Sequence, residues 1–225
     1  MKRYIPNMLT CSNLLCGCLA VFFAAYDNFG LAYAFIVGGA LFDFLDGFAA
    51  RILGVSSPIG KELDSLADDI TFGLAPSMIL FRLLVMCGVS FEASFAAFFV
   101  SAFSALRLAK FNLDERQTMG FLGLPTPANA LFFASLGVML PHISLFSTHR
   151  EVAFGILMVL IPLSCWLLVS EIPMFALKFK SFAWRGNEVR YVFLLLSAVL
   201  LALLGWWAFA IIIPLYIIVS LCTRS

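Results

Sequence analysis

The stretch VFLLLSAVLLALL, residues 192–204, decides the fold class. It is apolar at every position except Ser197, whereas a transmembrane β-strand alternates apolar and polar residues over about ten positions. Apolar runs of this kind recur along the chain and suit helices of about 20 residues, the length that crosses a hydrocarbon core of about 30 Å. The pattern therefore predicts membrane-spanning α-helices rather than a β-barrel.

The composition agrees with this prediction. Of the 225 residues, 63% are hydrophobic and 12% are charged, whereas about a quarter of the residues in a soluble domain are charged. We expect an all-α, polytopic integral membrane helical bundle that forms one membrane-embedded domain, residues 1–225. About eight transmembrane helices are expected, at residues 9–26, 31–50, 64–86, 91–110, 126–141, 152–170, 191–205 and 207–222.

The basic residues predict the topology. If the N-terminus is cytoplasmic, twelve of the fourteen lysines and arginines fall at cytoplasmic helix ends or loops, as the positive-inside rule expects. They are Lys2, Arg3, Arg51, Lys61, Arg107, Lys110, Arg116, Lys178, Lys180, Arg185, Arg190 and Arg224. Only Arg82 and Arg150 fall toward the other side, so both termini are expected in the cytoplasm. The net charge of +1 gives no reason to expect a nucleic-acid partner.

Four aspartates interrupt this apolar sequence within DFLDGFAARILGVSSPIGKELDSLAD, residues 43–68. They are Asp43, Asp46, Asp64 and Asp68. Each pair has helical i, i+3 or i, i+4 spacing and shares one face at the cytoplasmic end of an expected helix. A short reversal around Pro58 and Gly60 would bring the two faces together. Charged groups near membrane depth are costly, and therefore usually functional.

The chemistry of this cluster favours divalent cations. Four carboxylates packed closely repel one another unless cations neutralise them. Oxygen ligands select hard ions such as Mg²⁺ or Mn²⁺, which commonly bridge carboxylates and substrate phosphates. Gly47 permits close approach of the backbone to a phosphate, and Arg51 offers a planar, permanently charged fork. These residues indicate phosphoryl-type chemistry, although Gly47 and Ala50 also suit simple helix packing.

The spacing of these residues resembles a known family, the CDP-alcohol phosphatidyltransferases, whose pattern is D-x2-D-G-x2-A-R-x8-G-x3-D-x3-D. The matching positions are Asp43, Asp46, Gly47, Ala50, Arg51, Gly60, Asp64 and Asp68. The resemblance implies that the four aspartates ligate two divalent cations, Mg²⁺ or Mn²⁺, and that Gly47 and Arg51 contact the CDP part of a lipid substrate. It also implies that Asp68 is the catalytic base.

The first helix extends the resemblance. Its segment Pro6-Asn7-x2-Thr10-x2-Asn13-x3-Gly17 is similar to the segment of the same family whose polar side chains reach the nucleotide. Asn7 and Thr10 are therefore expected to bind the CDP-lipid, and Ser57 in the loop after Arg51 is a further candidate. Capping of a helix or loop is the alternative role for Asn7, Thr10 and Ser57.

Two neighbourhoods resemble the phosphatidylserine synthase branch of the family: LDSLADDITFGLAPS at 63–77, and RLAKFN at 107–112 followed by FLGLPTPANA at 121–130. This resemblance implies transfer of the phosphatidyl group of CDP-diacylglycerol to L-serine, with phosphatidylserine and CMP as products. A serine site needs a cation for the carboxylate and polar acceptors for the ammonium group. The acceptor-binding candidates are Arg107, Lys110, Thr71 and Asn112.

Several alternatives remain open from the sequence. The same chemistry could use another acceptor, glycerol 3-phosphate or inositol phosphate, because the aspartate pattern is shared across the family. The acids could instead belong to a divalent cation transporter or to a structural scaffold. Arg107 and Lys110 could serve only as topology signals. The resemblance further implies a bacterial inner membrane location, a site that faces the cytoplasm, and a homodimer.

Overall fold

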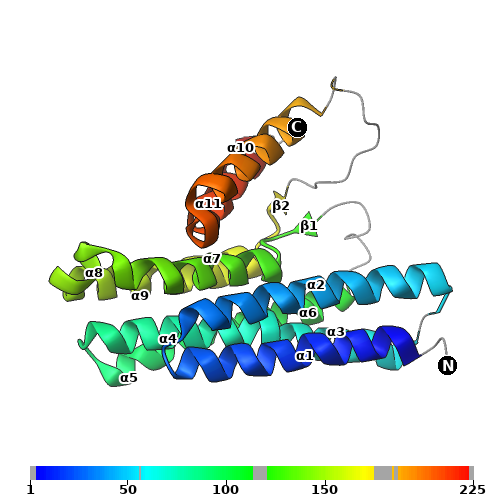
Figure 1. Cartoon of the computed structure of the whole chain (residues 1–225), viewed down its shortest axis with the longest axis horizontal. Helices are drawn as coiled ribbons and strands as arrows, with labels where there is room; N and C mark the ends of the chain where they lie inside the picture. The colour runs from blue at the N-terminus through cyan, green and yellow to red at the C-terminus, as the bar shows by residue number, and fades with distance from the viewer. Residues whose placement is uncertain (1–3, 56, 114–120, 175–183, 185–186, 223–225) are drawn as a thin grey trace.

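The computed structural model, shown in Figure 1, describes residues 4–55, 57–113, 121–174, 184 and 187–222. These residues form helices joined by short turns, together with one ribbon of two short strands. Seven of the basic residues used in the topology argument lie outside the described residues: Lys2, Arg3, Arg116, Lys178, Lys180, Arg185 and Arg224.

The first half of the chain forms three long helical segments after α1 (Tyr4–Ala25) and its turn. They are α2 (Phe29–Leu53); α3 (Pro58–Asp68), the π-helical segment η1 (Asp69–Leu74) and α4 (Ala75–Cys87); and α5 (Phe91–Ser94), η2 (Phe95–Phe98) and α6 (Phe99–Leu113). The second half contains α7 (Thr126–Met139), η4 (Leu140–His142), α8 (Ser144–Thr148), α9 (Arg150–Val169), α10 (Glu188–Leu204), η5 (Gly205–Ala208) and α11 (Phe209–Cys222). Strands β1 (Phe121–Leu122) and β2 (Pro173–Met174) pair antiparallel and tie the segment before α7 to the segment after α9.

Six helical segments within the described residues are long and apolar enough to cross a membrane, which confirms the prediction of an all-α integral membrane protein. One of them, Glu188–Cys222, reverses direction. The ring centroids of Phe193 and Tyr216 lie 6.0 Å apart, whereas 23 residues of straight helix span about 34 Å. The helices α10 and α11 therefore form a hairpin, whose turn contains Gly205 at φ 54°. Figure 1 shows this hairpin inclined to the bundle formed by α1–α9.

The turn between α2 and α3 lies a few residues earlier in the chain than the sequence predicted. Helix α2 ends at Leu53 and α3 begins at Pro58, so both Pro58 and Gly60 belong to α3. Gly54 takes the left-handed conformation at φ 62°, and the Ser57 hydroxyl accepts a hydrogen bond from the Gly60 amide at 3.0 Å. The expected reversal is present, but it ends before Pro58 because proline suits the first turn of a helix, where its missing N–H costs nothing.

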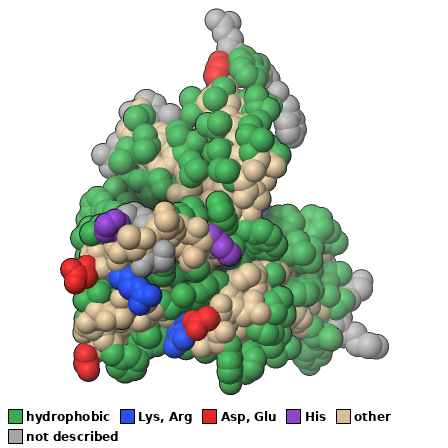
Figure 2. Space-filling model, turned by 60° about the vertical axis from the view of Figure 1, so that its left-hand side comes forward, with side chains coloured by type: hydrophobic (Ala, Val, Ile, Leu, Met, Phe, Trp, Pro, Cys, Tyr) green, Lys and Arg blue, Asp and Glu red, His purple; other side chains and the backbone are tan. Residues whose placement is uncertain are grey.

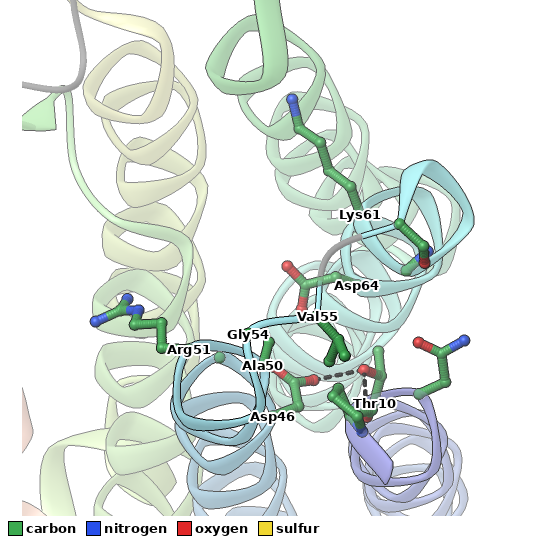
Figure 3. A pocket seen from close by; sticks show the side chains of 13 residues that line it. Thr10, Asp46, Ala50, Arg51, Gly54, Val55, Lys61 and Asp64 are labelled. Atoms are coloured by element: carbon green, nitrogen blue, oxygen red, sulfur yellow. Dashed lines mark hydrogen bonds between the residues drawn. The ribbon is translucent and has the colours of Figure 1, made fainter. Parts of the chain in front are cut away.

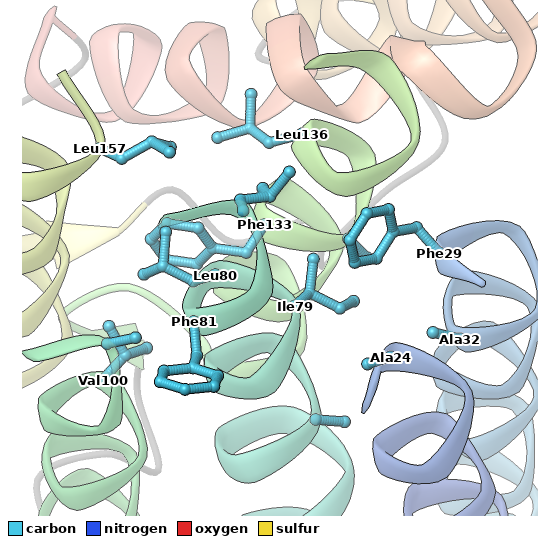
Figure 4. Close-up of a cluster of buried hydrophobic side chains, with 14 of the residues drawn as sticks. Ala24, Phe29, Ala32, Ile79, Leu80, Phe81, Val100, Phe133, Leu136 and Leu157 are labelled. Carbon is cyan, nitrogen blue, oxygen red and sulfur yellow. The ribbon is translucent and has the colours of Figure 1, made fainter. Parts of the chain in front are cut away.

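The buried core surrounds α4. Ile79 and Leu80 of α4 are fully buried and lie near Phe133 of α7 and Leu157 of α9, as Figure 4 shows. Apolar side chains gain little by leaving lipid for protein, so helices in a membrane are held mainly by close packing. In contrast, the outward faces of α10 and α11 carry exposed side chains such as Leu195, which suit contact with lipid.

Two glycines allow α1 and α2 to pack closely against η1. A Cβ added at Gly17 would lie 2.4 Å from Thr71 Oγ1, and one added at Gly39 would lie 2.5 Å from Thr71 Cγ2. Small residues allow such close approach of helices. The contact joins α1, α2 and η1 within one turn of Asp68, and so fixes the depth at which the acidic helices meet.

The far end of the bundle holds the charges that the sequence placed away from the acids. Arg82 of α4 forms an ion pair with Asp27, in the turn between α1 and α2, at 2.6 Å. Figure 2 brings this end forward and shows a few charged side chains and two histidine patches among hydrophobic surface. His142 and His149 lie in the η4–α9 region at this end, so the structure places both histidines away from the acids.

Replacement of Gly17 by alanine should destabilise the protein by about 1–3 kcal/mol, because the new methyl group meets backbone and side-chain atoms of Thr71. Gly155→Ala in α9 is the matched control, since nothing lies within 4 Å of its added Cβ, and removing a helical glycine stabilises by up to about 1 kcal/mol. Thermal unfolding in detergent measures both. Equal melting temperatures for the two variants would contradict the close contact.

Candidate functional site

Three of the predicted aspartates converge. One carboxylate oxygen from each of Asp43, Asp64 and Asp68 lies within 4.8 Å of the other two. Asp43 comes from α2, and the other two come from α3 at i, i+4 spacing; both helices pack against α1, which brings their acids to one place. Hard oxygen donors at this separation suit Mg²⁺ or Mn²⁺.

The surroundings of the cluster also suit a cation. Asp64 Oδ1 is buried and has no hydrogen-bond partner among the described residues. Within the same part of the chain, none of the four carboxylates forms an ion pair with a lysine or arginine. Buried carboxylates without partners are costly, and a bound divalent cation removes that cost. The residues present therefore fit a metal centre.

Asp46 lies outside this group of three and is held by the first helix. It is 6% exposed, and the Thr10 hydroxyl of α1 lies 2.6 Å from its Oδ2 and 3.0 Å from the Pro6 carbonyl oxygen. A hydroxyl has one proton to donate, and the shorter contact to the carboxylate is the stronger one. Figure 3 shows Thr10 and Asp46 facing each other across α1 and α2. The first helix thus orients one of the predicted metal ligands.

A groove of about 520 Å³ opens beside these acids between α1, α2 and the start of α3. All five predicted CDP-lipid-binding residues line it: Asn7, Thr10, Gly47, Arg51 and Ser57. A Cβ at Gly47 would meet nothing within 4 Å, so a ligand can approach that backbone. Figure 3 shows Arg51 extending away from the carboxylates. Asp64 belongs both to the groove and to the carboxylate cluster, and joins them into one site.

The predicted acceptor residues divide into two groups. Arg107 is only 7% exposed, and its Nε has no hydrogen-bond partner among the described residues. Its guanidinium carbon lies 5.9 Å from the ring centroid of Phe111 and within electrostatic range of Asp68. Lys110, on the same helix, is exposed. The structure therefore brings Arg107, a buried cation, toward the predicted base.

Thr71 and Asn112 are engaged within the protein. The fully buried Thr71 hydroxyl donates to the Asn13 carbonyl oxygen at 3.1 Å. Asn112 donates from Nδ2 to the Ser65 hydroxyl at 2.7 Å. Its main-chain carbonyl oxygen accepts a hydrogen bond from Lys61 Nζ at 3.0 Å. These bonds link η1 to α1 and α6 to α3, so both residues help to hold the helices that carry the acids.

Several residues outside the predicted set lie at or beside the site. Asn13 donates from Nδ2 to Asp68 Oδ1 at 2.9 Å, and Lys61 lines the groove. Asp69 Oδ1 and Ser104 Oγ are buried without a partner among the described residues. Asn13 could have been suspected, because it follows Thr10 by three residues and so shares its helix face. The positions of Asp69 and Ser104 depend on contacts between α6 and η1, which the sequence does not predict.

Residues 3–179 match the sequence pattern of the CDP-alcohol phosphatidyltransferases, and the chain belongs to that family. The match spans the aspartates, the groove and the bundle α1–α9, and it ends before the α10–α11 hairpin.

Three similar proteins carry the same name. The chain is 42% identical over 125 residues to a protein of Bacillus subtilis named CDP-diacylglycerol–serine O-phosphatidyltransferase, covering 56% of this chain and 70% of that protein. It is 37% identical over 128 residues to a Helicobacter pylori protein of the same name, covering 56% of this chain and 54% of that protein. A Mycobacterium leprae protein, again so named, is 29% identical over 224 residues, covering 96% of this chain and 70% of that protein.

Removal of the Thr10 hydroxyl should weaken metal binding. Thr10→Val leaves Asp46 buried without its donor, and a hydrogen bond to a charged group contributes about 1.5–3 kcal/mol, so the Kd for Mn²⁺ should rise about tenfold or more. Thr10→Ser retains the hydroxyl and should bind Mn²⁺ as the wild type does. Titration of purified protein followed by electron paramagnetic resonance measures both; unchanged binding by Thr10→Val would show that Asp46 does not depend on this bond.

Proposed function

We propose that this chain transfers the phosphatidyl group of CDP-diacylglycerol to the hydroxyl of L-serine and releases phosphatidylserine and CMP. The observation that carries the proposal is the carboxylate cluster of Asp43, Asp64 and Asp68, which shares Asp64 with a groove lined by the residues expected to bind the CDP-lipid. Membership of the family supports the reaction class. The printed names of the relatives support serine as the acceptor.

The four aspartates are the proposed ligands of two divalent cations, Mg²⁺ or Mn²⁺. Asp43, Asp64 and Asp68 offer oxygens close together, and Asp46 is oriented by Thr10. When bound, such cations neutralise charge on the diphosphate and stabilise CMP as the leaving group. In the groove, Gly47 gives the diphosphate access to the backbone, while Arg51, together with Asn7, Thr10 and Ser57, is proposed to bind the nucleotide. Lys61 adds a second cation to that groove.

Asp68 is the proposed general base. A serine hydroxyl is a poor nucleophile at neutral pH, and a positioned carboxylate can accept its proton as the hydroxyl oxygen attacks the lipid-side phosphorus. A new O–P bond to serine then forms while the P–O bond to CMP breaks. The remaining three acids stay available to hold cations throughout.

Arg107 is the proposed partner of the serine carboxylate. It is a buried cation with an unpartnered Nε among the described residues, and it lies on the side of Asp68. Lys110, Thr71 and Asn112 are the other acceptor candidates. The hydrogen bonds that Thr71 and Asn112 form within the protein favour Arg107 over them.

The proposed topology has eight membrane-spanning segments in one domain, residues 1–225, with both termini and the site on the cytoplasmic side of a bacterial inner membrane. Arg51, Lys61 and Arg107 lie at the end of the bundle that carries the acids, while Arg82 lies at the other end, in agreement with the positive-inside rule. The count of eight treats α7, α10 and α11 as separate crossings, of which α7 has 14 residues and spans about 21 Å. A homodimer is proposed on the family resemblance.

The reaction is tested with purified protein in detergent, CDP-diacylglycerol and Mn²⁺ or Mg²⁺, with one alcohol added at a time and release of CMP followed. L-serine should support release, and chelation of the cations should abolish it. Asp68→Asn should lower kcat by a factor of about 10²–10⁴, the usual contribution of a general base.

The controls separate the rival functions. Release of CMP with glycerol 3-phosphate or an inositol phosphate, but not with serine, would keep the reaction class and reject the acceptor. No release with any alcohol from folded protein, together with metal flux in proteoliposomes, would reject the enzyme and favour a cation transporter.

Arg107→Lys should raise the KM for L-serine by about tenfold or more, because a lysine keeps the charge but loses the planar fork that binds a carboxylate. The KM for CDP-diacylglycerol should stay within about twofold of the wild-type value, since Arg107 does not line the groove. Arg150→Lys, the same substitution at the far end of the bundle, is the control. Equal effects on the two KM values would show that Arg107 supports the fold and does not bind serine.

A further inference from the structure

Asn13 of α1 lies against the proposed base. Its side chain is fully buried, and its Nδ2 donates to Asp68 Oδ1 at 2.9 Å across 55 residues of sequence. Its carbonyl oxygen accepts the hydrogen bond of the Thr71 hydroxyl at 3.1 Å. Both the side chain and the backbone of Asn13 are therefore bonded to the helical segment α3–η1, on either side of the point where the π-helical turns begin.

The packing around Asn13 restricts its amide. A Cβ added at Gly39 of α2 would lie 2.8 Å from Asn13 Oδ1 and 2.5 Å from Thr71 Cγ2. The backbone of α2 thus lies beside the amide oxygen of Asn13. With Nδ2 toward Asp68 the amide donates to a carboxylate, whereas the reversed amide would place an oxygen against an oxygen. The buried position therefore favours one orientation of the side chain.

Two side chains on one face of α1 donate hydrogen bonds to the two acidic helices. Thr10 and Asn13 are one helical turn apart, and each aims one neutral donor at an aspartate: Thr10 at Asp46 of α2 and Asn13 at Asp68 of α3. No described side chain donates to Asp43 or Asp64. A neutral donor orients a carboxylate without pairing its charge, and so leaves that charge available to cations and to a proton.

We propose that Asn13 is a positioning residue for phosphatidyl transfer: its bond to Oδ1 fixes the rotation of the Asp68 carboxylate, so that the remaining lone pairs face the cation site and the acceptor hydroxyl. This inference rests on the proposed function, in which Asp68 is the base. Asn13 acts through Asp68 and touches neither substrate. It is also absent from the lining of the groove, so its loss should affect the chemical step and leave binding of the CDP-lipid intact.

The test compares Asn13→Ala and Asn13→Asp with the wild type in the CMP-release assay, with Ser12→Ala as the matched control. Ser12 is the neighbouring residue, and its hydroxyl donates a hydrogen bond to the Met8 carbonyl oxygen of the same helix. Asn13→Ala should lower kcat at least tenfold while the KM for CDP-diacylglycerol stays within about twofold. Asn13→Asp has nearly the same size as asparagine but replaces the donor by an acceptor, so it should be less active than Asn13→Ala.

If Asn13 only filled space, Asn13→Asp should be more active than Asn13→Ala, because the isosteric aspartate would fill the site better than alanine. Higher activity in Asn13→Asp than in Asn13→Ala, or a kcat of Asn13→Ala equal to that of Ser12→Ala, would overturn the inference while the proposed function stands. If Asn13→Ala is not recovered as folded protein, the kcat and KM of Asn13→Asp decide alone: a fall in kcat at constant KM supports the proposal, and wild-type kinetics reject it. Absence of CMP release by the wild type with every alcohol rejects the proposed function and this inference with it.

Discussion

The mutual repulsion of four carboxylates, carried by α2 and α3, governs how the surrounding helices are arranged. Such a cluster persists near a membrane only where its charge is neutralised, and no basic side chain within the described residues pairs with it. The fold instead brings oxygens of Asp43, Asp64 and Asp68 within 4.8 Å of one another. That arrangement costs free energy, which a bound divalent cation would offset, so the positions of the acids on α2 and α3 suit a metal site.

The neighbouring elements hold the carboxylate cluster in position. Both acidic helices, α2 and α3, pack against the first helix. The first helix supplies neutral donors to Asp46 and Asp68, and the close contact of Gly17 with Thr71 fixes its depth. Basic residues stay at the rim of the groove or on α6, where they can meet phosphates or a carboxylate of the substrates. The α10–α11 hairpin lies beyond the segment that matches the family and exposes apolar side chains suited to lipid.

Much of this arrangement follows from local patterns in the sequence. Apolar run lengths predicted the helices, and i, i+3 and i, i+4 spacing predicted which aspartates share a face, because both depend only on helix geometry. The groove residues Asn7, Thr10, Gly47, Arg51 and Ser57 came from the family pattern. The π-helical turns of η1 and the bond from Asn13 to Asp68 could not be predicted, since they depend on how close α1, α2 and α3 approach. The proline in α3 misled the placement of the turn because the same residue suits both a turn and the start of a helix.

Anomalous diffraction can show whether the four aspartates bind two divalent cations. Crystals of the protein grown with Mn²⁺ and CDP-diacylglycerol, measured at a wavelength where manganese scatters anomalously, should show two peaks bounded by the carboxylates of Asp43, Asp46, Asp64 and Asp68. Loss of both peaks in Asp64→Asn crystals would strengthen the assignment. Crystals of active protein with no peak at these aspartates, or with manganese bound only elsewhere, would contradict the account.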